Sequence, residues 1–115
     1  MAILSRDAIL KSDDLKKETV SVPEWGGDVI VAAMTGEARD EWEQSLVSGK
    51  TVSLANIRAR LVAATVVDEK GQRMFSNADV AALGKKSAAA LERCVKVAQR
   101  LNRLTESELG ELSKN

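Results

Sequence analysis

Residues 54–75 constrain the fold of this 115-residue chain most strongly, because they combine a core helix with a reversal of the chain. Apolar residues recur there with the period of one helical face, at Leu54, Ile57, Leu61 and Ala64. Two short apolar segments, Val66-Val67 and Met74-Phe75, then flank a polar turn that contains a glycine. We therefore predict a central helix over residues 54–66, followed by a short hairpin over residues 66–75.

The segment before this helix has the pattern of two strands followed by a helix. Ser5 is expected to cap a short helix near the N-terminus. Valines alternate with polar residues before Pro23, and a second apolar run follows, which predicts a β-hairpin over residues 18–34. Thr35 is then the expected N-cap of a helix over residues 36–48.

The segment after residue 75 is helical by its pattern. A capping box predicts a short helix over residues 77–84, and an amphipathic helix over residues 87–104 follows. A second capping box predicts a terminal helix over residues 106–113, and Ser53 is expected to cap the central helix. A chain of this length builds one core. The sequence thus predicts a single α+β domain with an N-terminal β-hairpin, a short second hairpin, four to five helices and a mostly helical C-terminal half.

The composition removes several classes of protein. No apolar run approaches the ~20 residues of a membrane span, and the N-terminus lacks the basic start of a signal peptide. The chain has no histidine and one cysteine, Cys94, which therefore has no partner for an internal disulfide. We predict no catalytic residues, no metal site and no cofactor, and we expect a reducing cytoplasm as the compartment.

The charges are distributed unevenly along the chain. Residues 1–53 carry six basic and ten acidic side chains, whereas residues 54–115 carry eleven basic and seven acidic ones, giving −4 and +4. A narrow basic stripe on the predicted helix 87–104 consists of Arg93, Lys96, Arg100 and Arg103. The predicted helix 36–48 carries an acidic surface at Asp40, Glu41 and Glu43. These two surfaces are either ordinary solvated faces or faces that meet between copies in a head-to-tail assembly.

Two other function classes remain open at this point. A small regulatory nucleic-acid-binding protein would use the basic stripe, although a net charge of zero argues against it. This alternative predicts retention on DNA that falls steeply with salt. A small enzyme would need a pocket of ligand size with convergent titratable groups, which no motif in the sequence indicates.

Trp25 lies at the predicted tip of the first hairpin, among proline and glycine residues. Aromatic residues in such positions often anchor protein partners. The opposing interpretation is that the indole folds back and caps the core, since tryptophan is highly buried on average. The sequence leaves both interpretations open.

The order and spacing of several short strings resemble one known family. These strings are VPEWGG at 22–27, TG at 35–36, RD at 39–40, RARLV at 58–62, VDE at 67–69, Gly71, FS at 75–76, LG at 83–84 and SAAAL at 87–91. Together they resemble the tail assembly chaperones of long-tailed, non-contractile bacteriophages. The resemblance covers nearly the whole chain.

This resemblance implies a non-enzymatic role in the host cytoplasm. It implies binding of the tape measure protein, which is kept soluble while tail tube subunits polymerise around it, and absence from the mature virion. It also implies a longer product, made by a programmed ribosomal frameshift, whose extra segment recruits the tail tube protein. Self-association into a homo-oligomer would raise avidity along a long client. We expect the apolar client contacts in the C-terminal helices, at Leu101, Leu104, Leu109 and Leu112.

Overall fold

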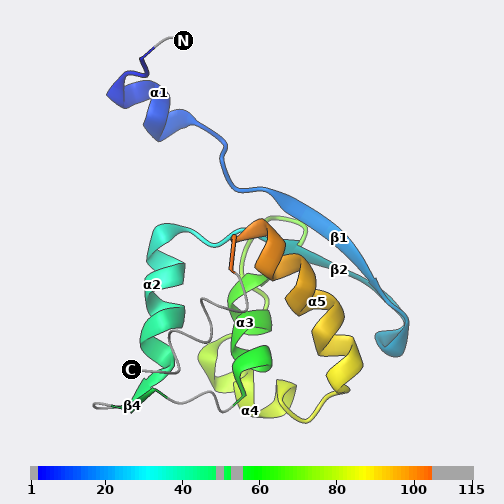
Figure 1. Ribbon diagram of the computed structural model, residues 1–115. Coiled ribbons are helices and arrows are strands. Elements are labelled where there is room, and N and C mark those ends of the chain that lie inside the picture. The colour runs from blue at the N-terminus through cyan, green and yellow to red at the C-terminus, as the bar shows by residue number, and fades with distance from the viewer. Residues whose placement is uncertain (1–2, 49–50, 53–55, 105–115) are drawn as a thin grey trace.

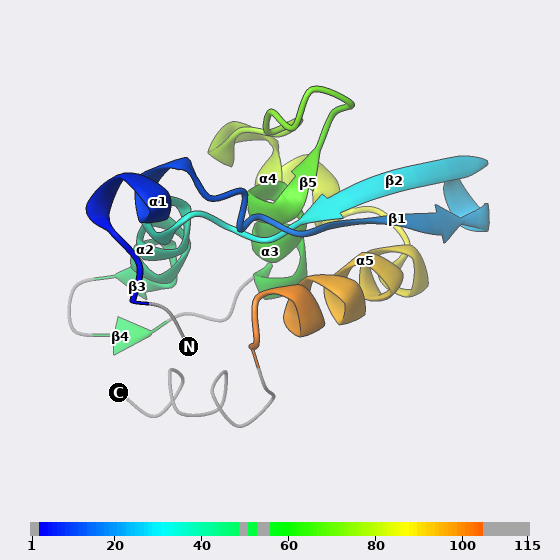
Figure 2. The ribbon, with the colours of Figure 1, turned by 90° about the horizontal axis from the view of Figure 1, so that it is seen from above.

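A computed structural model describes residues 3–48, 51–52 and 56–104 of the chain. A three-stranded antiparallel sheet, in the order β1-β2-β5, lies over the two helices α3 and α5 (Figures 1 and 2). A second, two-stranded sheet pairs β3 with β4. The predicted α+β class, with its N-terminal hairpin and mostly helical C-terminal half, is confirmed.

The N-terminal hairpin consists of β1 (Lys17–Val22) and β2 (Gly27–Ala32). Its turn is a short 3-10 helix, η1 (Pro23–Trp25), and Gly26 follows with φ 76°, a left-handed conformation that glycine adopts without strain. Val22 and Val31 lie on the face that turns toward the helices, where both are fully buried. The strands begin and end within a residue or two of the sequence-based boundaries.

Helix α2 (Gly36–Ser45) follows the hairpin and begins where the sequence indicates, since the Thr35 hydroxyl accepts a hydrogen bond from the Ala38 N–H at 3.0 Å. The prediction that this helix reaches residue 48 was wrong. The chain leaves the helix at Leu46, whose side chain is 1% exposed, and continues into β3 (Val47–Ser48), which pairs with β4 (Thr51–Val52). Burial of Leu46 and the strand pairing together end the helix early.

Helix α3 (Ile57–Thr65) occupies the centre of the molecule. It begins later than predicted because Asn56 has φ 55°, a left-handed conformation that cannot continue a right-handed helix. The predicted cap Ser53 lies outside the described residues. Residues 61–65 are all buried, so the second half of the helix is covered on every side, whereas Arg58 near its start is exposed.

The second hairpin is shorter than the first. Strand β5 (Val66–Val67) pairs with β2, and Val67 also forms an isolated antiparallel bridge with Arg73. The turn between them places Gly71 at φ 82° and is held by the Asp68 carboxylate, which accepts hydrogen bonds from two backbone N–H groups. The 3-10 helix η2 (Asn77–Asp79) and helix α4 (Val80–Leu83) follow, with the expected capping box at their start.

Helix α5 (Ala88–Leu101) ends before residue 104, the boundary that the sequence predicted. Arg103 adopts φ 54°, the Arg103 N–H bonds the Arg100 carbonyl at 3.4 Å, and the Leu104 N–H bonds the Gln99 carbonyl at 2.8 Å. This is the hydrogen-bond pattern of a Schellman motif, which turns the chain and packs its final apolar residue inward. The sequence concealed it because the left-handed position carries arginine instead of glycine.

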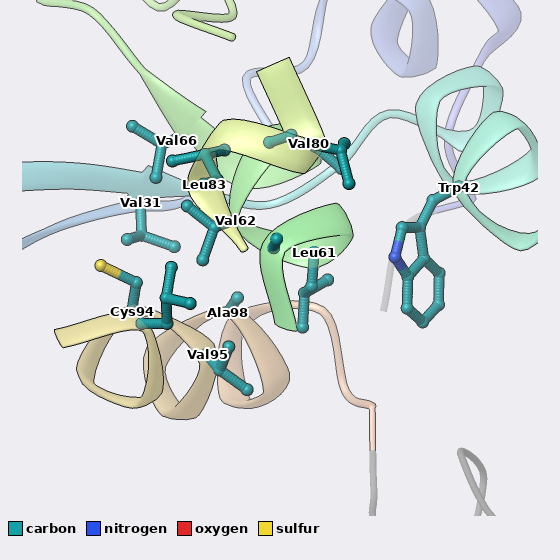
Figure 3. Close-up of a cluster of buried hydrophobic side chains, with 14 of the residues drawn as sticks. Val31, Trp42, Leu61, Val62, Val66, Val80, Leu83, Cys94, Val95 and Ala98 are labelled. Atoms are coloured by element: carbon teal, nitrogen blue, oxygen red, sulfur yellow. The ribbon is translucent and has the colours of Figure 1, made fainter. Parts of the chain in front are cut away.

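The core lies where the sheet, α3 and α5 meet. Figure 3 shows Val31 of β2, Leu61 and Val62 of α3, and Cys94 and Ala98 of α5 converging on one cluster. Trp42 of α2 extends this cluster to the far side of α3 and is 3% exposed. The core therefore joins residues that are distant in the sequence into one body.

Candidate interaction surface

Two ion pairs join the basic stripe of α5 to the N-terminal hairpin. Arg93 Nε lies 2.9 Å from Glu24 Oε1, and Arg100 Nη2 lies 2.6 Å from Glu18 Oε1. Part of the charge asymmetry seen in the sequence is therefore neutralised by ion pairs within one chain. Arg93 and Arg100 are already engaged by carboxylates, which weakens the case for the stripe as a nucleic-acid-binding surface.

The Arg93–Glu24 pair affects the titration of the carboxylate. A hydrogen bond from the backbone N–H of Glu24 itself, and then the Arg93 side chain, hold the pKa of Glu24 below its ordinary value of 4.5. Both interactions favour the charged form of the carboxylate. Because the folded-state pKa is depressed, the stabilisation is present above the ordinary value and is lost as the pH falls through the folded-state value.

We expect Arg93→Gln to raise the pKa of Glu24 part of the way back toward 4.5, since the backbone hydrogen bond remains. The wild-type protein should consequently lose more stability than the variant as the pH falls below 4.5. An NMR titration of the side-chain carboxyl carbons measures the pKa, and thermal unfolding across the same pH range measures the stability. Lys96→Gln, on an exposed position of the same helix, is the matched control. An unchanged Glu24 pKa in Arg93→Gln would contradict the assignment.

The other predicted site residues differ in how far the fold buries them. Lys96 is exposed, and Trp25 and Leu101 are half-buried and pack against the core cluster.

Arg103 is exposed at the left-handed position, whereas Leu104 is 4% exposed and belongs to the core. The expectation that Leu104 offers an apolar surface contact is therefore not supported, because the Schellman turn directs its side chain inward. Leu109, Leu112 and the predicted helix 106–113 lie outside the described residues.

The acidic surface of α2 remains on the outside of the molecule. Asp40 and Glu41 are exposed, and Glu43 accepts a hydrogen bond from Arg39 Nε at 3.2 Å within the same helix. Arg39 also donates through Nη1 to the Asn102 carbonyl oxygen at 3.1 Å, which ties α2 to the end of α5. Within the described part of the chain, no ion pair joins these three carboxylates to the basic stripe of α5.

A groove of about 390 Å³ lies between the start of β1, the N-terminal turn of α2 and the turn after β5. Its apolar lining includes Leu15, Ala33, Met34 and Ala38. Its charged lining consists of Asp13, Lys17, Glu37, Glu41 and Arg73. The sequence did not reveal this groove, because only the tertiary fold brings together its walls, which come from residues 13–17, 32–41, 64–67 and 71–73.

Helix α1 (Arg6–Lys11) lies apart from the body of the protein (Figure 1). Its start is capped as expected, since the Ser5 hydroxyl accepts a hydrogen bond from the Ala8 N–H at 3.1 Å. The helix contains no buried residue, and the large apolar side chains in and before it are exposed: Ile3, Leu4, Ile9 and Leu10. The apolar side of this helix was visible in the sequence, but its lack of an intramolecular partner was not.

The single cysteine of the chain, Cys94, is buried in the core. Burial raises the pKa of the Cys94 thiol above its ordinary value, which disfavours the thiolate that a nucleophile needs. Among the described residues, no three or more His, Cys, Asp or Glu side chains are grouped closely enough to hold a metal ion. In that same part of the chain, no helix has the length and hydropathy required to cross a bilayer.

Comparisons with known proteins agree on one relationship. A family model described as phage tail assembly chaperone matches residues 5–114. The structure is similar to a solved one titled "Structure of bacteriophage HK97 tail assembly chaperone", with a TM-score of 0.60 and 25% sequence identity. That similarity covers 84% of this chain and 89% of the other. No curated protein matches the sequence.

Proposed function

The chain belongs to the phage tail assembly chaperone family, and from this membership we propose that it binds the tape measure protein of its phage. The family acts as a non-enzymatic assembly helper. In this proposal the chaperone covers apolar stripes of a long helical client and keeps that client soluble while tail tube subunits polymerise around it. The observation that carries the proposal is the family match over nearly the whole chain.

The outer side of α5, together with the nearby tip of the first hairpin, is the client-binding surface in this proposal. Lys96 and Arg103 are exposed cations, and Trp25 and Leu101 each keep part of their side chain accessible. Arg93 and Arg100 contribute while paired with the hairpin carboxylates. The proposal also includes Leu109 and Leu112, which lie outside the described residues, as apolar contacts. Such modest contacts, repeated along the client, allow binding that is later released.

The proposal extends to the longer product and to the place of action. A frameshift near the codons for Lys114-Asn115 would add a segment that recruits the tail tube protein, and the chaperone would work in the host cytoplasm as a homo-oligomer. It would leave before the virion is complete. Mass spectrometry of infected cells and of purified virions tests these points, since the longer product is expected in the cells and neither product in the virions.

Co-expression with the tape measure protein of the same phage tests the central claim. We expect the soluble fraction of the tape measure protein to rise in the presence of the chaperone. The double variant Lys96→Glu, Arg103→Glu should reduce this effect, because it reverses two exposed charges on the proposed surface. The quantity measured is the ratio of soluble to total tape measure protein.

The matched control is Lys85→Glu, Lys86→Glu, which makes the same change in net charge at two exposed positions before α5. This control should leave the soluble fraction unchanged. A tape measure protein that is equally insoluble with and without the wild-type chain would overturn the proposed function. An equal loss of activity in both double variants would overturn the assignment of the surface.

A further inference from the structure

A pocket rich in cations lies between the start of β1 and the end of α5, which lie side by side in Figure 1. This cationic pocket has a volume of about 360 Å³ and is lined by Asp14, Lys16, Ala33, Arg100, Leu101 and Arg103. Three of these residues are cations and one is a carboxylate. Even when Glu18, the partner of Arg100, is counted as well, one net positive charge remains. The pocket therefore favours an acidic ligand.

Two of its cations have no carboxylate partner among the described residues. Lys16 and Arg103 are both exposed, and neither forms an ion pair in that part of the chain. Arg100 donates to Glu18 Oε1 and Oε2 through Nη2, at 2.6 and 2.5 Å, and makes no other side-chain hydrogen bond there. The pocket thus presents N–H donors from three cations to a ligand.

The backbone of Arg103 favours a binding role for its side chain. Its φ of 54° is a left-handed conformation that glycine adopts without strain and arginine does not. The side chain is exposed and lies outside the hydrophobic core cluster, so packing does not explain an arginine at this position. Residues held in sparsely populated backbone conformations concentrate at ligand-binding and active sites.

Hydrogen bonds hold the walls of the cationic pocket together. The Ala33 N–H donates to the Lys16 carbonyl oxygen at 2.8 Å, which fixes the segment before β1 beside the end of β2. The next residue, Met34, donates its N–H to Asn102 Oδ1 at 2.6 Å, which fixes the end of α5 beside the same segment. The walls that carry Lys16 and Arg103 are therefore joined, and a ligand loses little affinity to ordering them.

The lining also indicates which acidic ligand fits. Ala33 and Leu101 are half-buried, so the pocket combines apolar surface with its cations. An aspartate or glutamate side chain has the matching combination of a carbon stem and a carboxylate, which a guanidinium can bind through two N–H groups. A nucleic-acid backbone needs a run of cations. Here Arg93 pairs with Glu24, and Asp14 lines the pocket itself.

We propose that the cationic pocket binds the carboxylate of an aspartate or glutamate on a helical protein client, with Arg103 as the main donor and Lys16 as the second cation. The proposal rests on the proposed function, in which that client is the tape measure protein. It adds the chemistry of recognition, namely an acidic side chain next to apolar residues. The guanidinium fixes the position of the carboxylate, and Leu101 contacts the carbon stem.

Labelled peptides that cover the tape measure protein of the same phage test this proposal. Each peptide has about 15 residues, enough for a helix to form in water. Fluorescence anisotropy measures their binding to the full-length chain. We expect every bound peptide to contain aspartate or glutamate, and replacement of one such residue by its amide to weaken binding about tenfold, as for a lost hydrogen bond to a charged group. Arg103→Gly should weaken binding by a similar factor.

A double-mutant cycle gives the decisive measurement. In Arg103→Gly, the change from the acidic peptide to its amide form should cost much less affinity than in the wild type, because the main partner of the carboxylate is gone. Arg103→Lys keeps the positive charge and should restore part of the affinity. Lys85→Gln removes an exposed cation before α5 and outside the pocket, and this control should bind like the wild type.

Thermal unfolding separates binding from a structural role of Arg103. Arg103→Gly should not lower Tm, because glycine adopts the left-handed conformation without strain. Binding should nevertheless fall in this variant. A Tm that falls together with binding would show that the arginine serves the fold, and it would overturn the proposed role of its side chain.

Peptides that bind equally well in their acidic and amide forms would overturn the pocket proposal, as would an Arg103→Gly chain that binds like the wild type. A DNA oligonucleotide that binds the wild type but not Arg103→Gly would assign the pocket to nucleic acid and overturn it as well. The solubility of the tape measure protein in co-expression is measured separately. If that solubility rises while no peptide binds, the pocket proposal alone fails; if it does not rise, the proposed function fails.

Discussion

Leu61→Ala is expected to lower the free energy of unfolding by about 2–5 kcal/mol, the range measured when a buried leucine is truncated and leaves a cavity. Leu61 is 1% exposed and belongs to the same core cluster as Trp42 of α2, while α5 packs along the same helix (Figure 3). Because these elements are held by one another, the cavity cannot close without moving several of them. A domain of this size has only about 5–15 kcal/mol of stability in total, so the loss is a large fraction.

Chemical denaturation at low protein concentration measures this effect, and a fall of about 10–20 °C in Tm should accompany it. The matched control is Leu10→Ala, the same substitution at a side chain that is 66% exposed in α1. Its cost should stay within about 0.5 kcal/mol, as for surface positions generally. Equal losses in the two variants would contradict both the central position of α3 and the exposure of α1.

Asn102→Ala is expected to lower the free energy of unfolding by about 1–3 kcal/mol, because it leaves a backbone donor without its partner. Asn102 is 8% exposed at the end of α5. Its Oδ1 accepts a hydrogen bond from the Met34 N–H at 2.6 Å, and its Nδ2 donates to the Ala98 carbonyl at 2.9 Å. This side chain therefore connects the end of α5 to the segment between β2 and α2.

Hydrogen exchange gives a local measurement of the same bond. The Met34 amide should exchange faster in Asn102→Ala, by more than the global loss of stability accounts for. Asn77→Ala, at an exposed position in η2, is the control and should change neither quantity appreciably. An unchanged Met34 exchange rate would show that the Asn102 side chain does not hold this junction.

The Asn102 contact also bears on the groove between the start of β1 and α2, because Met34 is one of its lining residues. Weakening of this junction should loosen the groove as well as the end of α5. Arg39 supports the same place by donating to the Asn102 backbone oxygen, an interaction that the alanine substitution leaves in place. The shape of the groove and the packing of the end of α5 therefore depend on the same hydrogen bonds.

The family and the fold class could be read from the sequence. Alternating valines specify the first hairpin, and Thr35 specifies the start of α2, because strand period and capping are local properties of the chain. The turn that ends at Gly71 was likewise predictable, since a left-handed position strongly favours glycine. The absence of histidine from the sequence and the short strings that resemble the chaperone family pointed away from catalysis.

The element ends and the surfaces were decided by tertiary structure. Leu104 is buried because a Schellman turn with arginine at its left-handed position redirects the chain, and α2 ends early because Leu46 enters the core. Arg93 and Arg100 find their carboxylates on a hairpin that is distant in the sequence. Local pattern fixes what a segment prefers, whereas burial and long-range pairing depend on which segments meet in space. The exposure of α1 and the shape of the groove beside it therefore depend on the tertiary structure and not on local sequence pattern.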